Sequence, residues 1–216
     1  MALSIVANVT KPGAPRRAQL SCIVLAAGGS RRLGRPKQLV RRGYRPLLLN
    51  ALAAARAALG RDDSTVVVLG AGALRLRNVL RRAAPRECKT GASARVAYNA
   101  RWRAGLAGSL RVGLDALPRT ARAVLVMVVD QPNVDAAALT RLIAAWRKRP
   151  RVPAAAHYAG RAGVPAILPR GLWRAARSLE GDVGARALLR SAPAVNLVEM
   201  PEAELDVDTA EDLARL

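Results

Sequence analysis

Short runs of consecutive apolar residues alternate along this chain with longer segments whose apolar positions recur at helical spacing. The first of these runs ends abruptly at a glycine, which is typical of a strand buried in a parallel sheet. Strand-like runs occupy residues 22–27, 64–70, 94–98, 121–129 and 195–200. Helical patterns occupy residues 47–59, 73–84, the end of 99–117, and 135–149. This alternation predicts an α/β fold of three αβα layers around a mainly parallel sheet.

The second half of the chain interrupts this simple alternation. Residues 152–158 and 164–169 are strand-like and are joined by residues 159–163, which favours a hairpin. Residues 171–179 are helical, a glycine-containing break follows, and a further helix runs to about residue 190. A last helix is expected near the C-terminus, with Asp208 or Thr209 as its N-cap.

The length of 216 residues suits one α/β domain. We expect this domain to span residues 20–216, preceded by a flexible arm over residues 1–19. The core must be aliphatic, because the chain has three Trp, three Tyr and no Phe. No apolar run approaches the ~20 residues that a bilayer-spanning helix needs. Cys22 and Cys88 are too few for a disulfide framework, which favours a reduced, cytoplasmic protein.

The chain is strongly basic, with 36 Lys and Arg against 15 Asp and Glu and a net charge of +21. Such a field attracts nucleotides, phosphorylated substrates, nucleic acids or anionic membranes. The six aromatic residues do not alternate with the basic clusters, so platforms for stacking nucleic-acid bases are not expected.

The loop after the first apolar run carries the main candidate for chemistry. Gly28 and Gly29 let the backbone turn tightly and approach a ligand, and Ser30, Arg32 and Lys37 follow at once. The carboxyl end of a parallel strand is where α/β proteins bind ligands, and arginine and lysine favour phosphate. The loop fits neither GxxxxGK[ST] nor GxGxxG. The alternative is a solvated basic loop.

Two carboxylates, Asp130 and Asp208, also follow apolar runs. If both face the cleft at the strand ends, they supply, with phosphate oxygens, the oxygen ligands that Mg²⁺ prefers. Asp208 has a helix cap as its alternative role. His157 is the single histidine, so a histidine-based triad is not available. Ser109 is either an ordinary helix-face serine or a hydroxyl directed at a base or ribose.

Taken together, these segments resemble the MobA-like nucleotidyltransferase family, and within it the molybdenum cofactor cytidylyltransferase type. The segments that carry the resemblance are LAAGGSRRLGRPKQL at 25–39, NARWRAGLAGSLRVG at 99–113, DQP at 130–132, GVP at 163–165, GDVGARALL at 181–189 and DVDTAEDLARL at 206–216. Related guanylyltransferases usually carry LAGG and a DK pair. This chain has Ala27 and Pro36-Lys37 instead, which favours cytidylyl transfer.

The resemblance implies a role for each matching residue. Arg32 and Lys37 would hold the phosphates and act with Asp130 in catalysis, and Asp130 and Asp208 would hold Mg²⁺. The residues expected to contact the nucleotide are Leu25, Ala26, Ala27, Gly28, Gly29, Ser30, Lys37 and Ser109.

The reaction implied is transfer of CMP from CTP to the phosphate of a molybdopterin-type substrate, with release of pyrophosphate. A molybdoenzyme that receives the product would be a partner. Val164 stands where the family commonly has His or Asn, which leaves the acceptor open. The alternatives are a nucleotidyltransferase that uses a sugar phosphate or GTP, a basic nucleic-acid-binding protein, and a non-catalytic cofactor carrier.

Overall fold

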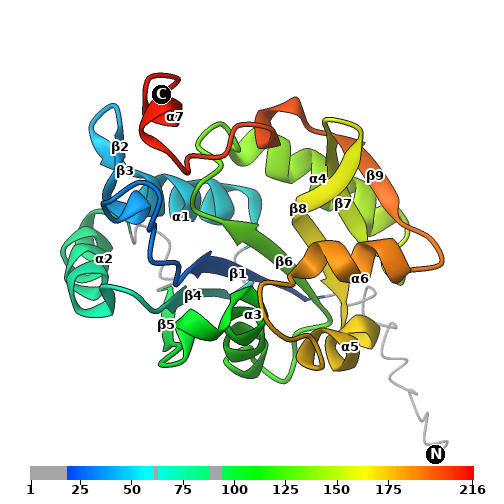
Figure 1. Cartoon of the computed structure of the whole chain (residues 1–216). Helices are drawn as coiled ribbons and strands as arrows, with labels where there is room; N and C mark the ends of the chain where they lie inside the picture. Colours follow the sequence, from blue (N-terminus) through cyan, green and yellow to red (C-terminus); the bar gives the residue numbers. More distant parts are fainter. Residues whose placement is uncertain (1–18, 61–62, 88–93) are drawn as a thin grey trace, which may run out of the picture.

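A computed structural model of the protein describes residues 19–60, 63–87 and 94–216. Its centre is a seven-stranded sheet in the order β5-β4-β1-β6-β8-β7-β9 (Figure 1). The arm expected over residues 1–19 lies, apart from Gln19, outside the described residues, as does Cys88. The strands are β1 (Leu20–Ala26), β4 (Thr65–Leu69), β5 (Arg95–Tyr98), β6 (Ala123–Val128), β7 (Ala154–Tyr158), β8 (Arg161–Pro169) and β9 (Asn196–Glu199).

The sheet is parallel except at one strand. β1 pairs in parallel with β4 and β6, β4 pairs with β5, and β7 pairs with β9. β8 is antiparallel to both of its neighbours, β6 and β7. A short hairpin turn at Ala159 and Gly160 connects it to β7. The carboxyl ends of β1 and β6 therefore lie at the same edge of the sheet as the hairpin turn.

Helices cover both faces of the sheet (Figure 1). One apolar cluster packs residues of α1 (Leu47–Ala58), α2 (Ala73–Glu87) and α4 (Ala136–Lys148) on one face. A second cluster packs α3 (Leu106–Asp115), α5 (Trp173–Arg177) and α6 (Ala185–Ser191) on the other. These layers confirm the predicted αβα architecture. The core is mainly aliphatic, as expected, with Trp146 and Trp173 as its buried tryptophans.

A third, smaller cluster joins the loop after β1 to the end of the chain. Leu33, Val40, Leu47 and Val207 are buried together, and leucines of the C-terminal segment pack on them. That segment contains α7 (Ala210–Leu213), whose cap is Thr209. Thr209 and Asp212 form a reciprocal capping box, so Thr209, and not Asp208, is the cap. The side chain of Asp208 is therefore available for another role.

The sequence pattern missed several short elements and misplaced a few boundaries. A two-stranded ribbon of β2 (Arg41–Arg42) and β3 (Arg45–Pro46) was not predicted, because its strands are too short to show an alternation. β8 begins three residues earlier than expected, and α2 continues to Glu87. Three 3₁₀ turns were also missed: η1 (Lys37–Leu39), η2 (Trp102–Ala104) and η4 (Pro201–Ala203). A fourth, η3 (Arg170–Leu172), forms the start of the helix predicted at residues 171–179. Within the described ranges, no helix has the length and apolarity for a bilayer crossing.

Candidate active site

The loop after β1 is held in place by its own side chains. The amide nitrogen of Gln38 donates to the carbonyl oxygens of Ala26 and Gly28, at 2.9 and 2.8 Å. The Oγ of Ser30 accepts a hydrogen bond from the backbone N–H of Lys37 at 3.0 Å, with Ser30 at a left-handed φ of 50°. Gln38 is buried whereas Gly28 is exposed, so a buried amide holds an exposed loop in place. Sequence reasoning did not single out Gln38.

Gly29 lies where the loop meets the segment before α3. A Cβ on Gly29 would lie 2.7 Å from the indole of Trp102 in η2. Gly28 has nothing within 4 Å of its Cβ position and faces open space. The first glycine therefore leaves room for a ligand, and the second allows the two segments to pack closely.

Two cations of the loop reach two carboxylates across the strand ends. Lys37 Nζ donates to Asp130 Oδ2 at 2.6 Å and to Asp208 Oδ1 at 2.7 Å. Arg32 donates to the other oxygen of Asp208 at 2.6 Å. Lys37 and Asp130 are mostly buried, with 13% and 20% of their side chains exposed, whereas Arg32 is 72% exposed. Charges from three distant segments thus meet in one place.

Asp130 keeps one carboxylate oxygen without a protein partner. Its Oδ1 is buried and has no hydrogen bond within the described structure. The same ranges contain no group of three or more acidic, histidine or cysteine side chains arranged to hold a metal. Asp130 and Asp208 nevertheless fit a Mg²⁺ that is shared with a nucleotide, because such a site needs only one or two carboxylates plus phosphate oxygens and water.

Asp206 is a third carboxylate at this site, which sequence reasoning missed. Burial raises the pKa of Asp206 from 3.8 to about 6, and the negative charges of Asp130 and Asp208 add to the effect. Lys37 and Arg186 oppose the rise. Apolar and acidic residues alternate at positions 205–208, and this pattern could have indicated Asp206. It buries Leu205 and Val207 and places Asp206 and Asp208 together on the other side.

The backbone fixes the acidic segment against β6. The N–H of Val207 donates to the carbonyl of Asp130 at 2.8 Å. Val207 is fully buried in the small third cluster. This backbone hydrogen bond and that cluster therefore hold Asp208 near Asp130, in addition to the bonds that both make with Lys37.

Ser109 is buried and is bonded to another side chain. Its Oγ accepts from the amide of Asn99 at 3.0 Å, and Asn99 in turn accepts from the N–H of Arg101. Ser109 is 3% exposed and Asn99 is 4% exposed. In this arrangement Ser109 orients Asn99 at the end of β5. Direct contact between Ser109 and a base stays a prediction.

The other half of the cleft is organised by Gln131. Its amide nitrogen donates to the carbonyls of Ala203 and Val164, at 2.8 and 3.1 Å, and to the Tyr158 hydroxyl at 3.3 Å. Arg186 also donates to that hydroxyl, at 3.4 Å. Gln131 thereby ties the end of β6 to the hairpin, and Arg186 brings a positive charge to the same region.

The remaining candidate nucleophiles take no part in this arrangement. Cys22 lies inside β1, and burial raises the pKa of its thiol well above the ordinary value. His157 Nδ1 is 2.6 Å from Glu199 Oε1 in an exposed pair between β7 and β9.

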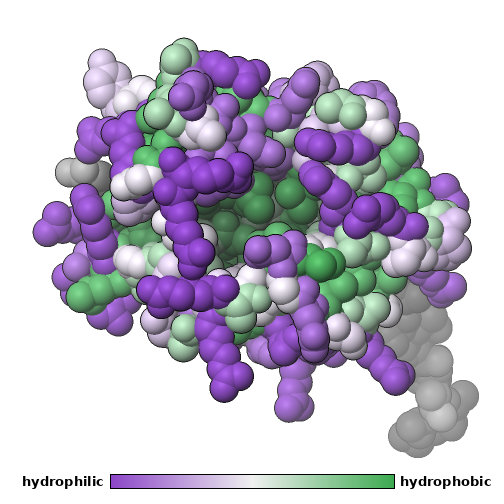
Figure 2. Space-filling view, in the orientation of Figure 1, coloured by the Kyte–Doolittle hydropathy of each residue, from purple (hydrophilic) through white to green (hydrophobic). Residues whose placement is uncertain are grey.

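Figure 2 shows a hollow near the middle of the molecular face, with an apolar floor and a hydrophilic rim. The charged groups available at the strand ends are the cations Arg32 and Lys37 and the carboxylates Asp130 and Asp208.

The fold, together with a glycine loop and opposed charges at the strand ends, defines a Rossmann-like α/β protein of the nucleotide-binding class. Residues 22–197 match the MobA-like NTP transferase domain, so the protein belongs to the MobA-like NTP transferase family. This confirms the resemblance to the MobA-like family that the sequence showed.

Several relatives show how far this similarity reaches. Nicotine blue oxidoreductase from Paenarthrobacter nicotinovorans is 35% identical over 205 residues, covering 90% of this chain and 94% of the relative. Rv0371c from Mycobacterium tuberculosis H37Rv has a TM-score of 0.72 and 31% identity, covering 91% of this chain and 97% of that chain. A crystal structure of Rv0371c in complex with manganese has a TM-score of 0.70 and 30% identity, covering 92% and 97%.

A more distant structure shares the fold alone. It is 4-diphosphocytidyl-2C-methyl-D-erythritol synthase from Anaerococcus prevotii, with a TM-score of 0.70 and 14% identity, covering 91% of this chain and 93% of that chain. At this identity the likeness concerns architecture and does not extend to a substrate.

Proposed function

We propose that the protein transfers CMP from CTP to the terminal phosphate of a molybdopterin-type substrate in the cytoplasm and releases pyrophosphate. The observation that carries the proposal is the pairing of Lys37 with both Asp130 and Asp208 at the end of the glycine loop. Family membership supports a nucleoside triphosphate as the donor. Ala27 and the Pro36-Lys37 pair support CTP over GTP, by resemblance to cytidylyltransferases.

The proposed reaction is a single displacement at phosphorus. An oxygen of the acceptor phosphate forms a bond to the α-phosphorus of CTP while the bond from that phosphorus to the bridging β-oxygen breaks. The electron pair leaves with pyrophosphate. A phosphate monoester is already largely dianionic at neutral pH, so no protein base has to remove a proton. The buried Cys22 and the paired His157 are consistent with direct transfer.

The chain would contribute positioning and charge. Arg32 and Lys37 would bind the triphosphate and offset the charge that develops on pyrophosphate. Asp130 and Asp208 would hold Mg²⁺, which would offset phosphate charge in the bound state. The manganese complex of Rv0371c supports a divalent metal in a relative of similar size. The buried, unpartnered Oδ1 of Asp130 supports this assignment in this chain.

Pyrophosphate release tests the proposal directly. Purified protein is incubated with Mg²⁺, the molybdenum-loaded cofactor and each of the four NTPs in turn. The expected result is release with CTP that depends on the cofactor. A preference for GTP would reject the cytidylyl assignment, and release with a sugar phosphate in place of the cofactor would reassign the acceptor. Binding of CTP and cofactor without release would support the carrier alternative.

The oxidoreductase among the relatives gives a second candidate function. Its 35% identity extends over most of both chains, so redox chemistry in this fold is a competing assignment. The same preparation is therefore assayed with NADH or NADPH and nicotine blue. Oxidation of the nicotinamide, with no pyrophosphate release in the first assay, would favour the second candidate over nucleotidyl transfer.

A further inference from the structure

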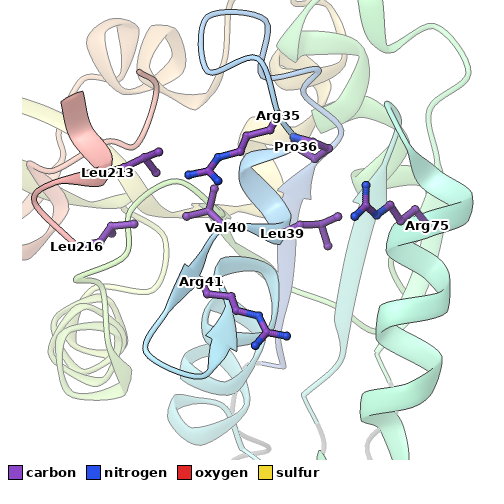
Figure 3. Close-up of a pocket in the computed structure, with 8 residues that line it drawn as sticks. All are labelled: Arg35, Pro36, Leu39, Val40, Arg41, Arg75, Leu213 and Leu216. Carbon is purple, nitrogen blue, oxygen red and sulfur yellow. The ribbon is translucent and has the colours of Figure 1, made fainter. Parts of the chain in front are cut away.

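A separate pocket lies beside the candidate active site, behind the loop after β1. It has a volume of about 520 Å³. Its walls come from the residues just before η1, from the end of η1, from β2, from the first turn of α2 and from the C-terminal segment (Figure 3). The lining residues are Arg35, Pro36, Leu39, Val40, Arg41, Arg75, Leu213 and Leu216. None of the residues assigned to phosphate or metal binding lines it.

The pocket combines an apolar surface with positive charge. Figure 3 shows Leu213 and Leu216 on one side and Arg75 from α2 on the other, with Leu39 and Val40 between them. The apolar side chains are partly or fully buried, and Val40 is 7% exposed. The apolar portion of a ligand would therefore pack against a preformed apolar surface.

The three arginines of the pocket lack acidic partners within the described residues. Among residues 19–60, 63–87 and 94–216, neither an ion pair nor a side-chain hydrogen bond involves Arg35, Arg41 or Arg75. The nearby acid Asp212 is engaged in the capping box of α7. Three uncompensated guanidinium groups around one cavity attract an anion, and each offers a forked pair of donors to phosphate.

We propose that this pocket binds a small anionic amphiphile, such as a phosphate ester with a short apolar body, independently of the nucleotide site. The arginines would hold the phosphate, and the leucines would cover the apolar part. The occupant of this pocket would also touch the neighbouring site. η1 begins at Lys37 and α7 follows Asp208 closely, so the occupant would contact both segments that carry the Lys37–Asp208 ion pair.

Hexyl phosphate is a suitable probe, measured by titration calorimetry on the full-length protein. We expect it to bind more tightly than inorganic phosphate and than hexanol, because each of these lacks one half of the recognition. The double variant Arg41→Ser/Arg75→Ser should lower its affinity by about tenfold or more. Arg77→Ser is the matched control, because Arg77 is an exposed arginine of α2 outside the pocket. It should leave the affinity unchanged.

Equal affinity for hexyl phosphate and inorganic phosphate would overturn this proposal. So would an unchanged affinity in a folded double variant. A loss in Arg32→Ser as large as that in the double variant would also overturn it, because it would place the probe at the nucleotide loop. Hydrogen exchange locates the probe independently. Protection is expected at residues 35–41 and 210–216, whereas protection confined to residues 28–32 would also reject the pocket.

Discussion

Lys37 and Asp130 meet at 2.6 Å although 93 positions separate them in the chain. One comes from the turn after the glycine loop and the other from the end of β6, and both side chains are largely buried. A contact this deep is less screened by solvent than a surface ion pair. It marks the place where the proposed metal and triphosphate would meet.

The first prediction concerns that carboxylate. Asp130→Asn keeps the shape of the side chain but removes its charge, so it should lower pyrophosphate release by about 100-fold or more. The far-ultraviolet circular dichroism spectrum should match that of the wild type. Asp115→Asn is the control, because Asp115 pairs with Arg177 on an exposed surface. If Asp130→Asn retains full turnover, Asp130 has no part in metal binding.

The second prediction concerns the amide that holds the loop. Gln38→Leu removes the amide that donates to the carbonyls of Ala26 and Gly28, and the bond to Ala26 is buried. Unfolding in urea should show a loss of about 1–3 kcal/mol. Asn50→Ala removes only an exposed 3.4 Å contact with the Arg45 carbonyl, and its effect should be within about 0.5 kcal/mol. Equal effects of the two variants would argue against the bracing role of Gln38.

The third prediction uses the two adjacent glycines. Gly29→Ala places a methyl group 2.7 Å from Trp102 and should destabilise the protein by about 1–3 kcal/mol through overpacking. Gly28→Ala meets nothing within 4 Å and should leave stability within about 0.5 kcal/mol of wild type. Gly28→Ala should instead weaken nucleotide binding, since its methyl group points into open space beside the proposed ligand. Thermal unfolding and nucleotide titration of both variants separate the two effects.

The fourth prediction is a pH dependence at Asp206. Its pKa is raised to about 6 in the folded protein, whereas the unfolded chain has the ordinary value of 3.8. Between about pH 4 and pH 6 the folded state keeps a proton that the unfolded state has released, so this group's contribution to stability falls as pH rises. Asp206→Asn cannot lose a proton, so it should gain stability relative to wild type across that window. Urea unfolding without divalent metal measures the difference. A difference that does not change with pH would reject the shifted pKa.

The layered architecture was predictable because each central strand is a short, uninterrupted apolar run that ends at a glycine or an aspartate. Those endings also indicated the edge of the sheet where polar groups collect, as Asp130 illustrates. The helices beside the sheet were recognisable from their alanine and leucine spacing. These signals are local, and tertiary contacts did not override them.

The parts that escaped prediction depend on contacts between distant segments. Gln38 looks like an ordinary polar residue until its bonds to the end of β1 are seen. Asp206 was not singled out in the sequence, because its burial beside Asp130 and Asp208 is a tertiary feature. The hydrogen bond between Asn99 and Ser109 was likewise not predictable, and contact between Ser109 and a base stays a prediction.

The antiparallel strand, β8, separates two parts of the cleft. The loops of one part lead into helices, whereas the turn of the other part joins two strands. On one side, the glycine loop and the end of β5 lead into helices that pack on the sheet, so a change in loop length there would disturb a whole layer. On the other side, Tyr158 and Arg161 flank a turn between two adjacent strands. Such a turn can gain or lose residues without moving any helix. A change in loop length should therefore be tolerated better in the hairpin than in the glycine loop.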